Sequence, residues 1–283
     1  MTRSSLRRIL PLLAAIITAR GLVAQSGSPV YTPGHLTSVQ QVAREVYKEL
    51  IEINSGVTTG NITTAANAMA KRFRDAGIPE ADIFVGGPRP ERYNVVARIR
   101  GKNPAGRKPL LLLAHIDVVE ANARDWKRDP FKLTEEGGFF YARGASDDKA
   151  MAAALTDNLI RFQQEKLRPQ RDLVLALTCD EEIIPSPFNG VEFLLKDHRA
   201  LIDAELALNE GGGGELDKAG RPVRLSIQAG EKVFQSYKLE VTNPGGHSAS
   251  GRRDNAIVDL AGGLARLGAF DFPAKLLPVT RAY

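Results

Sequence analysis

The chain has 283 residues, of which 43% are hydrophobic, and carries a formal net charge of +5 at pH 7. This composition is ordinary for a globular protein and excludes a collagen-like or wholly disordered chain. The positive charge does not predict nucleic-acid binding, because residues 1–24 hold four arginines and no acid, which leaves 34 basic against 33 acidic residues in the nearly neutral remainder.

The first 24 residues have the pattern of a secretory signal peptide. A basic start is followed by the apolar run Ile9–Ala19, which is too short to span a bilayer, and Leu22-Val23-Ala24 offers a cleavage site. We expect residues 1–24 to be removed, so that the protein is secreted or periplasmic without membrane contact. An uncleaved anchor and a disordered tail are the alternatives.

Helices and a linker are predicted in the first third of the chain. Residues 25–36 are rich in Ser, Pro and Gly and predict a linker. Thr37 with Gln40 predicts a capping box that opens an amphipathic helix. A second helix is expected from about Thr63 to Asp75. The segments 82–85 and 93–100 predict strands.

Three unbroken apolar runs follow, and they predict strands covered on both faces. The runs are Pro109–Ala114, Asp172–Thr178 and Ala204–Leu208. Helices predicted at about Asp148–Glu165 and Val191–Lys196 lie between them. This alternation predicts an α/β fold with a mixed, mostly parallel sheet flanked by helices. Cys179, the one cysteine, falls in an apolar run and predicts a buried, inert thiol.

The pattern changes after residue 214. Val223–Ile227 and Lys232–Val241 predict the two strands of an antiparallel hairpin, and Asp254–Leu267 predicts a helix. We therefore divide the chain into a catalytic domain over residues 37–220 and a smaller α+β domain over residues 221–283.

Acidic residues follow each of the three apolar runs, and the first run is also followed by a histidine. The clusters are His115-Ile116-Asp117, Asp180-Glu181-Glu182 and Asn209-Glu210, and Asp147-Asp148 lies where a helix begins. The carboxyl ends of parallel strands meet at one edge of a sheet, so these groups are expected to converge. Crowded carboxylates favour a cation, and imidazole with carboxylates suits zinc. Taken singly, each cluster has a plainer reading as a surface turn, a solvated loop or helix N-terminal acids.

The ordered set of motifs resembles the zinc-dependent aminoacylases, glutamate carboxypeptidases and dipeptidases, with acetylornithine deacetylase and succinyl-diaminopimelate desuccinylase. The matching segments, between about Tyr93 and Asn255, are Leu112–Val119, Trp126 with Asp129-Pro130-Phe131, Arg143–Lys149, Asp180-Glu181-Glu182, Glu210, and Gly245-Gly246-His247-Ser248. Glu120 stands where that family usually has proline, which we interpret as loop variation.

The resemblance implies a dizinc exopeptidase-like fold and two Zn²⁺ ions, with Co²⁺ or Mn²⁺ as alternatives. His115 and Glu210 would bind the first ion, Glu182 the second, and Asp147 would bridge both. Glu181 would be the general base that activates water for attack on an amide. Asp117 would hold and polarise His115.

The residues beyond 220 resemble the family's lid and dimerisation domain. His247 would then donate to the developing oxyanion and Asn255 would lie near the substrate, whereas the plainer interpretation of His247 is a surface loop histidine. A small peptide or an N-acyl amino acid is the expected substrate. A homodimer through the lid is the expected assembly.

In the family that the chain resembles, a histidine after the lid domain binds the second zinc. No histidine follows His247 in this sequence. We therefore expect a C-terminally truncated chain with an incomplete lid. The alternative function is that of a non-catalytic remnant that binds metal or dimerises. Another dizinc aminopeptidase family is the third interpretation, which the Gly-Gly-His-Ser motif disfavours.

Overall fold

The computed structural model describes residues 35–102, 106–232, 234–251 and 253–282. Contacts between residues divide the chain into two units after Gln41, and the second unit begins at Val42. The predicted signal peptide and most of the predicted linker lie outside the described residues, so both stay predictions. In the described part of the chain, no helix is long and apolar enough to cross a membrane. The predicted division near residue 220 also stays a prediction.

Helix α1 (Ser38–Glu52) begins as the sequence predicts. The N–H of Thr37 donates to Gln40 Oε1 at 3.0 Å, and the N–H of Gln40 donates to Thr37 Oγ1 at 3.3 Å. This reciprocal pair is a capping box, which satisfies amides that have no partner inside the helix. Further along the helix, the side chains of Val46 and Leu50 are fully buried.

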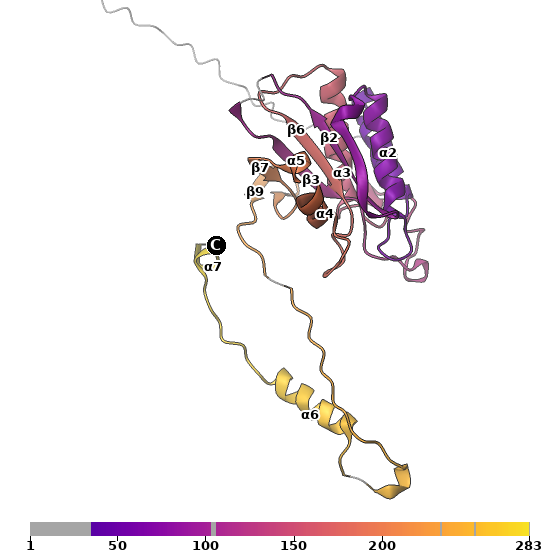
Figure 1. Cartoon of the computed structure of the whole chain (residues 1–283), viewed down its shortest axis with the longest axis vertical. Coiled ribbons are helices and arrows are strands. Elements are labelled where there is room, and N and C mark those ends of the chain that lie inside the picture. Colours follow the sequence, from indigo (N-terminus) through magenta and orange to yellow (C-terminus); the bar gives the residue numbers. More distant parts are fainter. Residues whose placement is uncertain (1–34, 103–105, 233, 252, 283) are drawn as a thin grey trace, which may run out of the picture. The chain divides into compact units, whose positions relative to one another are not determined.

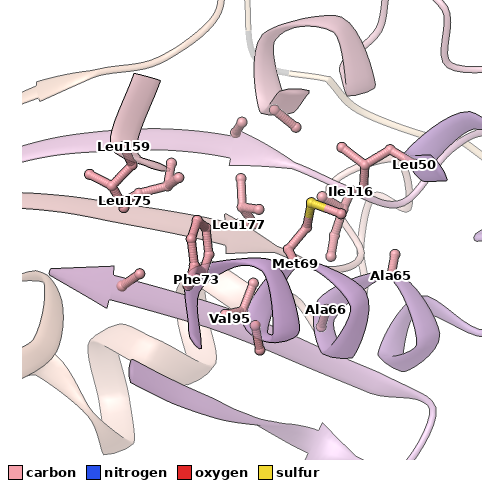
Figure 2. Packing of buried hydrophobic residues seen from close by; sticks show 14 of the residues in the cluster. Leu50, Ala65, Ala66, Met69, Phe73, Val95, Ile116, Leu159, Leu175 and Leu177 are labelled. Atoms are coloured by element: carbon pink, nitrogen blue, oxygen red, sulfur yellow. The ribbon is translucent and has the colours of Figure 1, made fainter. Parts of the chain in front are cut away.

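Helix α2 (Ile62–Asp75) has a defined start and end. The Asn61 side chain accepts the N–H of Thr64 and caps the first turn. Gly77 follows the helix with φ +86°, a left-handed conformation that glycine adopts without a steric penalty. Between these ends, Met69 and Phe73 are fully buried against the sheet (Figure 2).

A five-stranded mixed sheet forms the centre of the second unit (Figure 1). Its strands are β1 (Ile83–Arg89), β2 (Arg92–Ile99), β3 (Leu110–His115), β6 (Leu173–Thr178) and β7 (Leu206–Leu208). The order across the sheet is β1-β2-β6-β3-β7. β3 pairs in parallel with both β6 and β7, while β2 pairs antiparallel with β1 and β6. In this sheet, β2 therefore runs against its four companions.

Apolar side chains cover both faces of β3 and β6, which explains their unbroken apolar runs. The residues of β7 are exposed, so the predicted two-sided burial of the third run is wrong. Leu175 and Leu177 belong to one buried cluster, while Val174 and Ala176 between them belong to another. Successive side chains of a strand point to opposite faces, so each strand supplies both clusters. The first cluster also holds residues of α1, α2 and α3, whereas the second holds residues of α4 and α5. The predicted α/β fold is confirmed.

The crossover helices lie near their predicted positions. They are α3 (Lys149–Gln164) and α4 (Gly190–Asp197). The short α5 (Arg199–Ile202) was not predicted. Short 3₁₀ turns cover Glu80–Asp82 and Ala123–Asp125.

A hairpin of β4 (Thr134–Glu136) and β5 (Phe139–Tyr141) was not predicted. Its turn holds Gly137 and Gly138, both with positive φ, and the Gly-Gly pair between two extended segments was the available signal.

The last third of the chain corrects one prediction. Strand β9 (Pro222–Ser226) forms, but it pairs with β8 (Gly213–Leu216), and the predicted strand at Lys232–Val241 is wrong. A strand needs a hydrogen-bonded neighbour, and no described strand pairs with that segment. A 3₁₀ turn at Ser248–Ser250, α6 (Ala256–Gly268) and α7 (Pro278–Ala282) complete the elements.

Candidate metal centre

Three of the four predicted metal ligands come together from separate segments at the carboxyl edge of the sheet. His115 is the last residue of β3, and Glu210 lies two residues after β7. Asp147 precedes α3. One ligand atom from each of these three residues lies within 4.8 Å of the other two. The crossover topology therefore assembles a group that could hold a divalent ion.

His115 lies at the centre of this group. Its Nε2 is 2.9 Å from Asp147 Oδ1, and 3.9 Å from both Glu181 Oε2 and Glu210 Oε1. The His115 side chain is 3% exposed, whereas the Asp147 side chain is 66% exposed. The histidine is thus fixed in the interior while the acids face an accessible side, as a site that admits a substrate requires.

Asp117 connects the histidine to the turn that carries the two glutamates. Its side chain is fully buried, and its Oδ1 and Oδ2 accept the backbone N–H groups of Glu181 and Glu182 at 3.2 and 3.0 Å. His115 Nδ1 lies 3.0 Å from the Asp117 carbonyl oxygen and 3.6 Å from Oδ1. The imidazole therefore has Nδ1 turned to Asp117 and Nε2 turned to the carboxylates.

Asp148 has a position that sequence reasoning did not identify. It is buried and is the N-cap residue of α3, yet its side chain makes no cap hydrogen bond. Instead, its Oδ2 accepts the backbone N–H of His115 at 3.2 Å. Adjacent Asp147 and Asp148 thus serve different purposes, since one carboxylate enters the site and the other holds the strand end.

The charges at this edge are unbalanced. Burial raises the pKa of Glu181 and Glu182, and neighbouring carboxylates such as Asp147 raise both further. Burial lowers the pKa of His115, but Asp117 and other acids outweigh it and raise the pKa to about 10. A cation would relieve this carboxylate repulsion. The donor set of imidazole and carboxylates therefore fits a divalent metal such as zinc.

Comparisons with known proteins agree with this geometry. The model of peptidase family M20/M25/M40 matches residues 111–269, which include His115, Asp117, Asp147, Asp148, Glu181, Glu182 and Glu210. The chain belongs to this family. The resemblance read from the sequence motifs is thereby confirmed.

Members of the M20 family with curated names match in part. The N-fatty-acyl-amino acid synthase/hydrolase PM20D1.1 of Danio rerio is 36% identical over 171 residues, covering 58% of this chain and 32% of the relative. The N-fatty-acyl-amino acid synthase/hydrolase PM20D1 of Homo sapiens is 30% identical over 186 residues, covering 65% and 36%. The chain thus spans about a third of the length of these relatives.

A solved M20 structure shares the fold. The metallo-carboxypeptidase Sso-CP2 of Sulfolobus solfataricus is 26% identical with a TM-score of 0.50, covering 63% of this chain and 39% of that chain. The mixed sheet and its flanking helices are therefore those of M20 peptidases.

Glu182 stands apart from the three-residue group. Its carboxylate is not among the atoms that lie within 4.8 Å of one another, although Asp147 acts on its pKa. Its assignment to a second ion stays a prediction.

A cavity of about 480 Å³ adjoins this M20 site. Glu181 and Glu210 line it together with Gln228 and Glu231. Neither of the latter two was predicted, because both belong to a segment without regular structure and no motif marked them.

His247 and Asn255 make local contacts. His247 Nδ1 accepts the N–H of Ala249 at 3.2 Å, and Asn255 Oδ1 accepts the N–H of Ile257 at 2.9 Å as the N-cap of α6. Both residues line one cavity of about 410 Å³. Among the described contacts, none joins either residue to the carboxyl edge of the sheet, so their substrate-binding roles stay predictions.

Buried polar contacts behind the site connect it to the first helices. Lys149 Nζ donates to the Ile53 carbonyl at 2.9 Å, and Ser55 Oγ donates to the Ile116 carbonyl at 2.6 Å. Burial lowers the pKa of Lys149 to about 7. These contacts hold the segments Leu112–Val119 and Arg143–Lys149, which supply His115 and Asp147.

Proposed function

We propose that this chain provides the metal-binding part of a hydrolase that cleaves amide bonds in small substrates. The observation that supports this most strongly is the convergence of His115, Asp147 and Glu210 within 4.8 Å, with Glu181 Oε2 only 3.9 Å from His115 Nε2. Three ligand atoms beside a carboxylate with a raised pKa are the parts that metal-assisted hydrolysis needs.

In this proposal, two Zn²⁺ ions are held by residues of the carboxyl edge. His115 and Glu210 would hold one ion, Glu182 would hold the other, and Asp147 would serve both. Bound zinc would lower the pKa of water toward neutrality and polarise the substrate carbonyl. Zinc is favoured over Co²⁺ and Mn²⁺ only by its preference for mixed imidazole and carboxylate ligands.

Glu181 is the proposed general base. Burial and the surrounding acids raise the pKa of its carboxyl group, which favours holding a proton between two steps. Its Oε2 would take the proton of the attacking water and return it to the leaving amine. Asp117 orients both partners, because it accepts the Glu181 amide and faces His115.

His247 is the proposed donor to the oxyanion. Because the N–H of Ala249 donates to Nδ1, the neutral imidazole carries its proton on Nε2 and can donate there. Donors aimed at developing charge are among the largest contributions to catalysis. Asn255 belongs to the same cavity and is proposed to contact the substrate.

Dipeptides, N-acyl amino acids and C-terminal peptide bonds are the proposed substrate class. Support comes from the names of similar proteins, which include N-fatty-acyl-amino acid hydrolases, acetylornithine deacetylases and a metallo-carboxypeptidase. Export of the protein and a homodimer through residues 221–283 belong to the same proposal.

The test uses the full-length protein with zinc and a panel of dipeptides and N-acyl amino acids. We expect hydrolysis that a chelator abolishes and zinc restores. Glu181→Gln should lower kcat by about 10²-fold or more, the range for loss of a general base. Its zinc content should equal that of the wild type.

The matched control is Glu205→Gln, which removes an exposed acid that pairs with Arg171 at 2.9 Å. This variant should keep normal turnover. Zinc binding without hydrolysis of any panel member would support the non-catalytic alternative. A Glu181→Gln variant as active as the wild type would exclude the proposed base.

A further inference from the structure

Asp180, directly before the two glutamates, is a buried acid outside the group of expected metal ligands. Its side chain is 1% exposed, and its φ of +54° lies in the left-handed region. Such a conformation is disfavoured for residues other than glycine, although Asp and Asn tolerate it best. Strained residues of this kind persist where their surroundings hold them, and they cluster at functional sites.

Arg92 at the start of β2 faces this acid across the sheet. Val95 pairs with Leu177, so the same register brings Arg92 opposite Asp180. Arg92 Nε lies 2.9 Å from Asp180 Oδ1, with the arginine side chain 12% exposed. The N–H is not directed along this line, so the contact is an attraction between charges rather than a hydrogen bond.

Further contacts fix the rest of the turn. Ser186 Oγ donates to Asp180 Oδ2 at 2.9 Å, and Asn189 Nδ2 donates to the Asp180 carbonyl at 3.2 Å. Buried Asn94 accepts the N–H of Cys179 at 3.0 Å. With Asp180 held in this conformation, the next two amides point at the two oxygens of Asp117.

We infer that Asp180, anchored by Arg92 and Ser186, is the positioning residue that sets the orientation of Glu181 and Glu182. This inference rests on the proposed function only for its catalytic consequence. Asp180 acts through the backbone and touches neither metal nor substrate. Its loss should therefore misplace Glu181 and Glu182 without changing His247 and Asn255, the residues proposed to contact the oxyanion and the substrate. A displacement of about 1 Å in such a group can lower turnover up to about 10²-fold.

The decisive variant is Asp180→Asn, measured in the full-length protein with zinc. Asparagine keeps the size and the tolerance for positive φ, so the change isolates the charge that faces Arg92. We expect kcat to fall about tenfold or more with KM changed less than about twofold. Hydrogen exchange of the Glu181 and Glu182 amides should become about tenfold faster.

The matched control is Asp172→Asn at the other end of the same two strands. Arg98 Nη1 lies 2.9 Å from Asp172 Oδ2, in a pair as close as that of Arg92 with Asp180. This variant should lose stability yet keep kcat and the exchange of both glutamate amides within about twofold. A general effect of breaking a buried ion pair would instead lower kcat in both variants and overturn the inference.

Two further outcomes are distinguished. If the wild type does not hydrolyse any substrate, the proposed function fails, and the exchange of the two amides alone decides whether Asp180 positions the turn. If Asp180→Asn does not fold, Ser186→Ala replaces it, with an expected threefold or greater acceleration of the same exchange. Unchanged exchange in the folded variant overturns the inference.

Discussion

The acidic side chains at the two ends of the central strands differ in whether they have basic partners. At the edge where β3 and β6 begin, the acids have basic partners from the chain itself. The pairs, with N–O distances of 2.7–2.9 Å, are Arg100–Asp82, Arg98–Asp172, Lys108–Asp203 and Arg171–Glu205. At the edge where the same strands end, His115 faces several acids, and the pKa of Glu181 and of Glu182 is raised.

This difference indicates that the acids at one edge stabilise the fold and that those at the other edge suit a cation site. A paired acid stabilises the fold with partners that the chain already contains. Crowded carboxylates without enough cations lower the stability of the folded chain unless a cation arrives from outside. The same strands and helices position the acids at both edges. The two sets of acids therefore differ in the basic partners available to them. The predictions below test that contrast.

The largest expected effect is stabilisation by metal at the carboxyl edge. Zinc at 100 times its dissociation constant should raise the free energy of unfolding by about 2.7 kcal/mol. Thermal unfolding with and without zinc measures this shift. His115→Ala should abolish it, because the residue shared by all three close contacts is lost.

The matched control for that prediction is Lys108→Gln at the opposite edge, which should keep the full zinc-induced shift. An equal shift in His115→Ala would place the stabilising metal elsewhere.

The second effect is loss of stability at the opposite edge. Asp172→Asn should lower the free energy of unfolding by about 2 kcal/mol, below the usual value for a fully buried pair because Arg98 is partly exposed. Chemical denaturation measures the change. Stability equal to that of the wild type would mean that this edge gains nothing from its ion pairs.

Sequence patterns predicted the strands well wherever burial is two-sided. Residues 173–177 supply both buried clusters, so no position between the two ends of the strand is polar. The segment Lys232–Val241 shows where such a pattern fails. Alternating polar and apolar residues allow an extended chain, but they do not provide the neighbouring strand whose hydrogen bonds make a sheet.

The candidate site was predictable to the extent that topology determines it. His115 and Glu210 follow strands that run in parallel, so their convergence follows from the fold. Asp148 was not predictable, since its place beside α3 equally fits a helix N-terminal acid. The Arg92–Asp180 pair depends on cross-strand register, which the residue pattern of a single strand does not contain.

A third prediction has the opposite sign to the change in stability expected for Asp172→Asn. Asp148→Asn in the metal-free protein should leave stability unchanged or raise it by about 1 kcal/mol, since a buried charge among acids is removed. The asparagine oxygen can still accept the His115 N–H. Denaturation of both Asp→Asn variants under one condition makes the comparison. Equal losses in the two variants would show that the edges do not differ.

The smallest effect is expected at Glu120, an acid of the carboxyl edge that does have partners. Its Oε1 accepts the N–H groups of Thr58 and Thr59, each at 2.9 Å, and Thr59 Oγ1 donates to Oε2 at 2.8 Å. Burial raises the pKa of Glu120, but these hydrogen bonds outweigh it and lower the pKa. The residue is therefore part of a loop contact beside the site.

Because the folded state lowers this pKa, the ionised carboxylate adds stability above the pKa of the unfolded chain, and that contribution disappears as the pH falls through the lower, folded value. Glu120→Gln should therefore lower the free energy of unfolding by about 1 kcal/mol at pH 7, with the difference from the wild type shrinking in acid. The control is Glu136→Gln, an exposed acid paired with Arg128, which should change stability little. Denaturation from pH 7 to pH 3 measures both. A Glu120→Gln deficit that persists unchanged in acid would show that shape, rather than charge, is what Glu120 contributes. In that case the charge of a hydrogen-bonded acid at the carboxyl edge would not stabilise the fold, unlike the charges of the paired acids at the opposite edge.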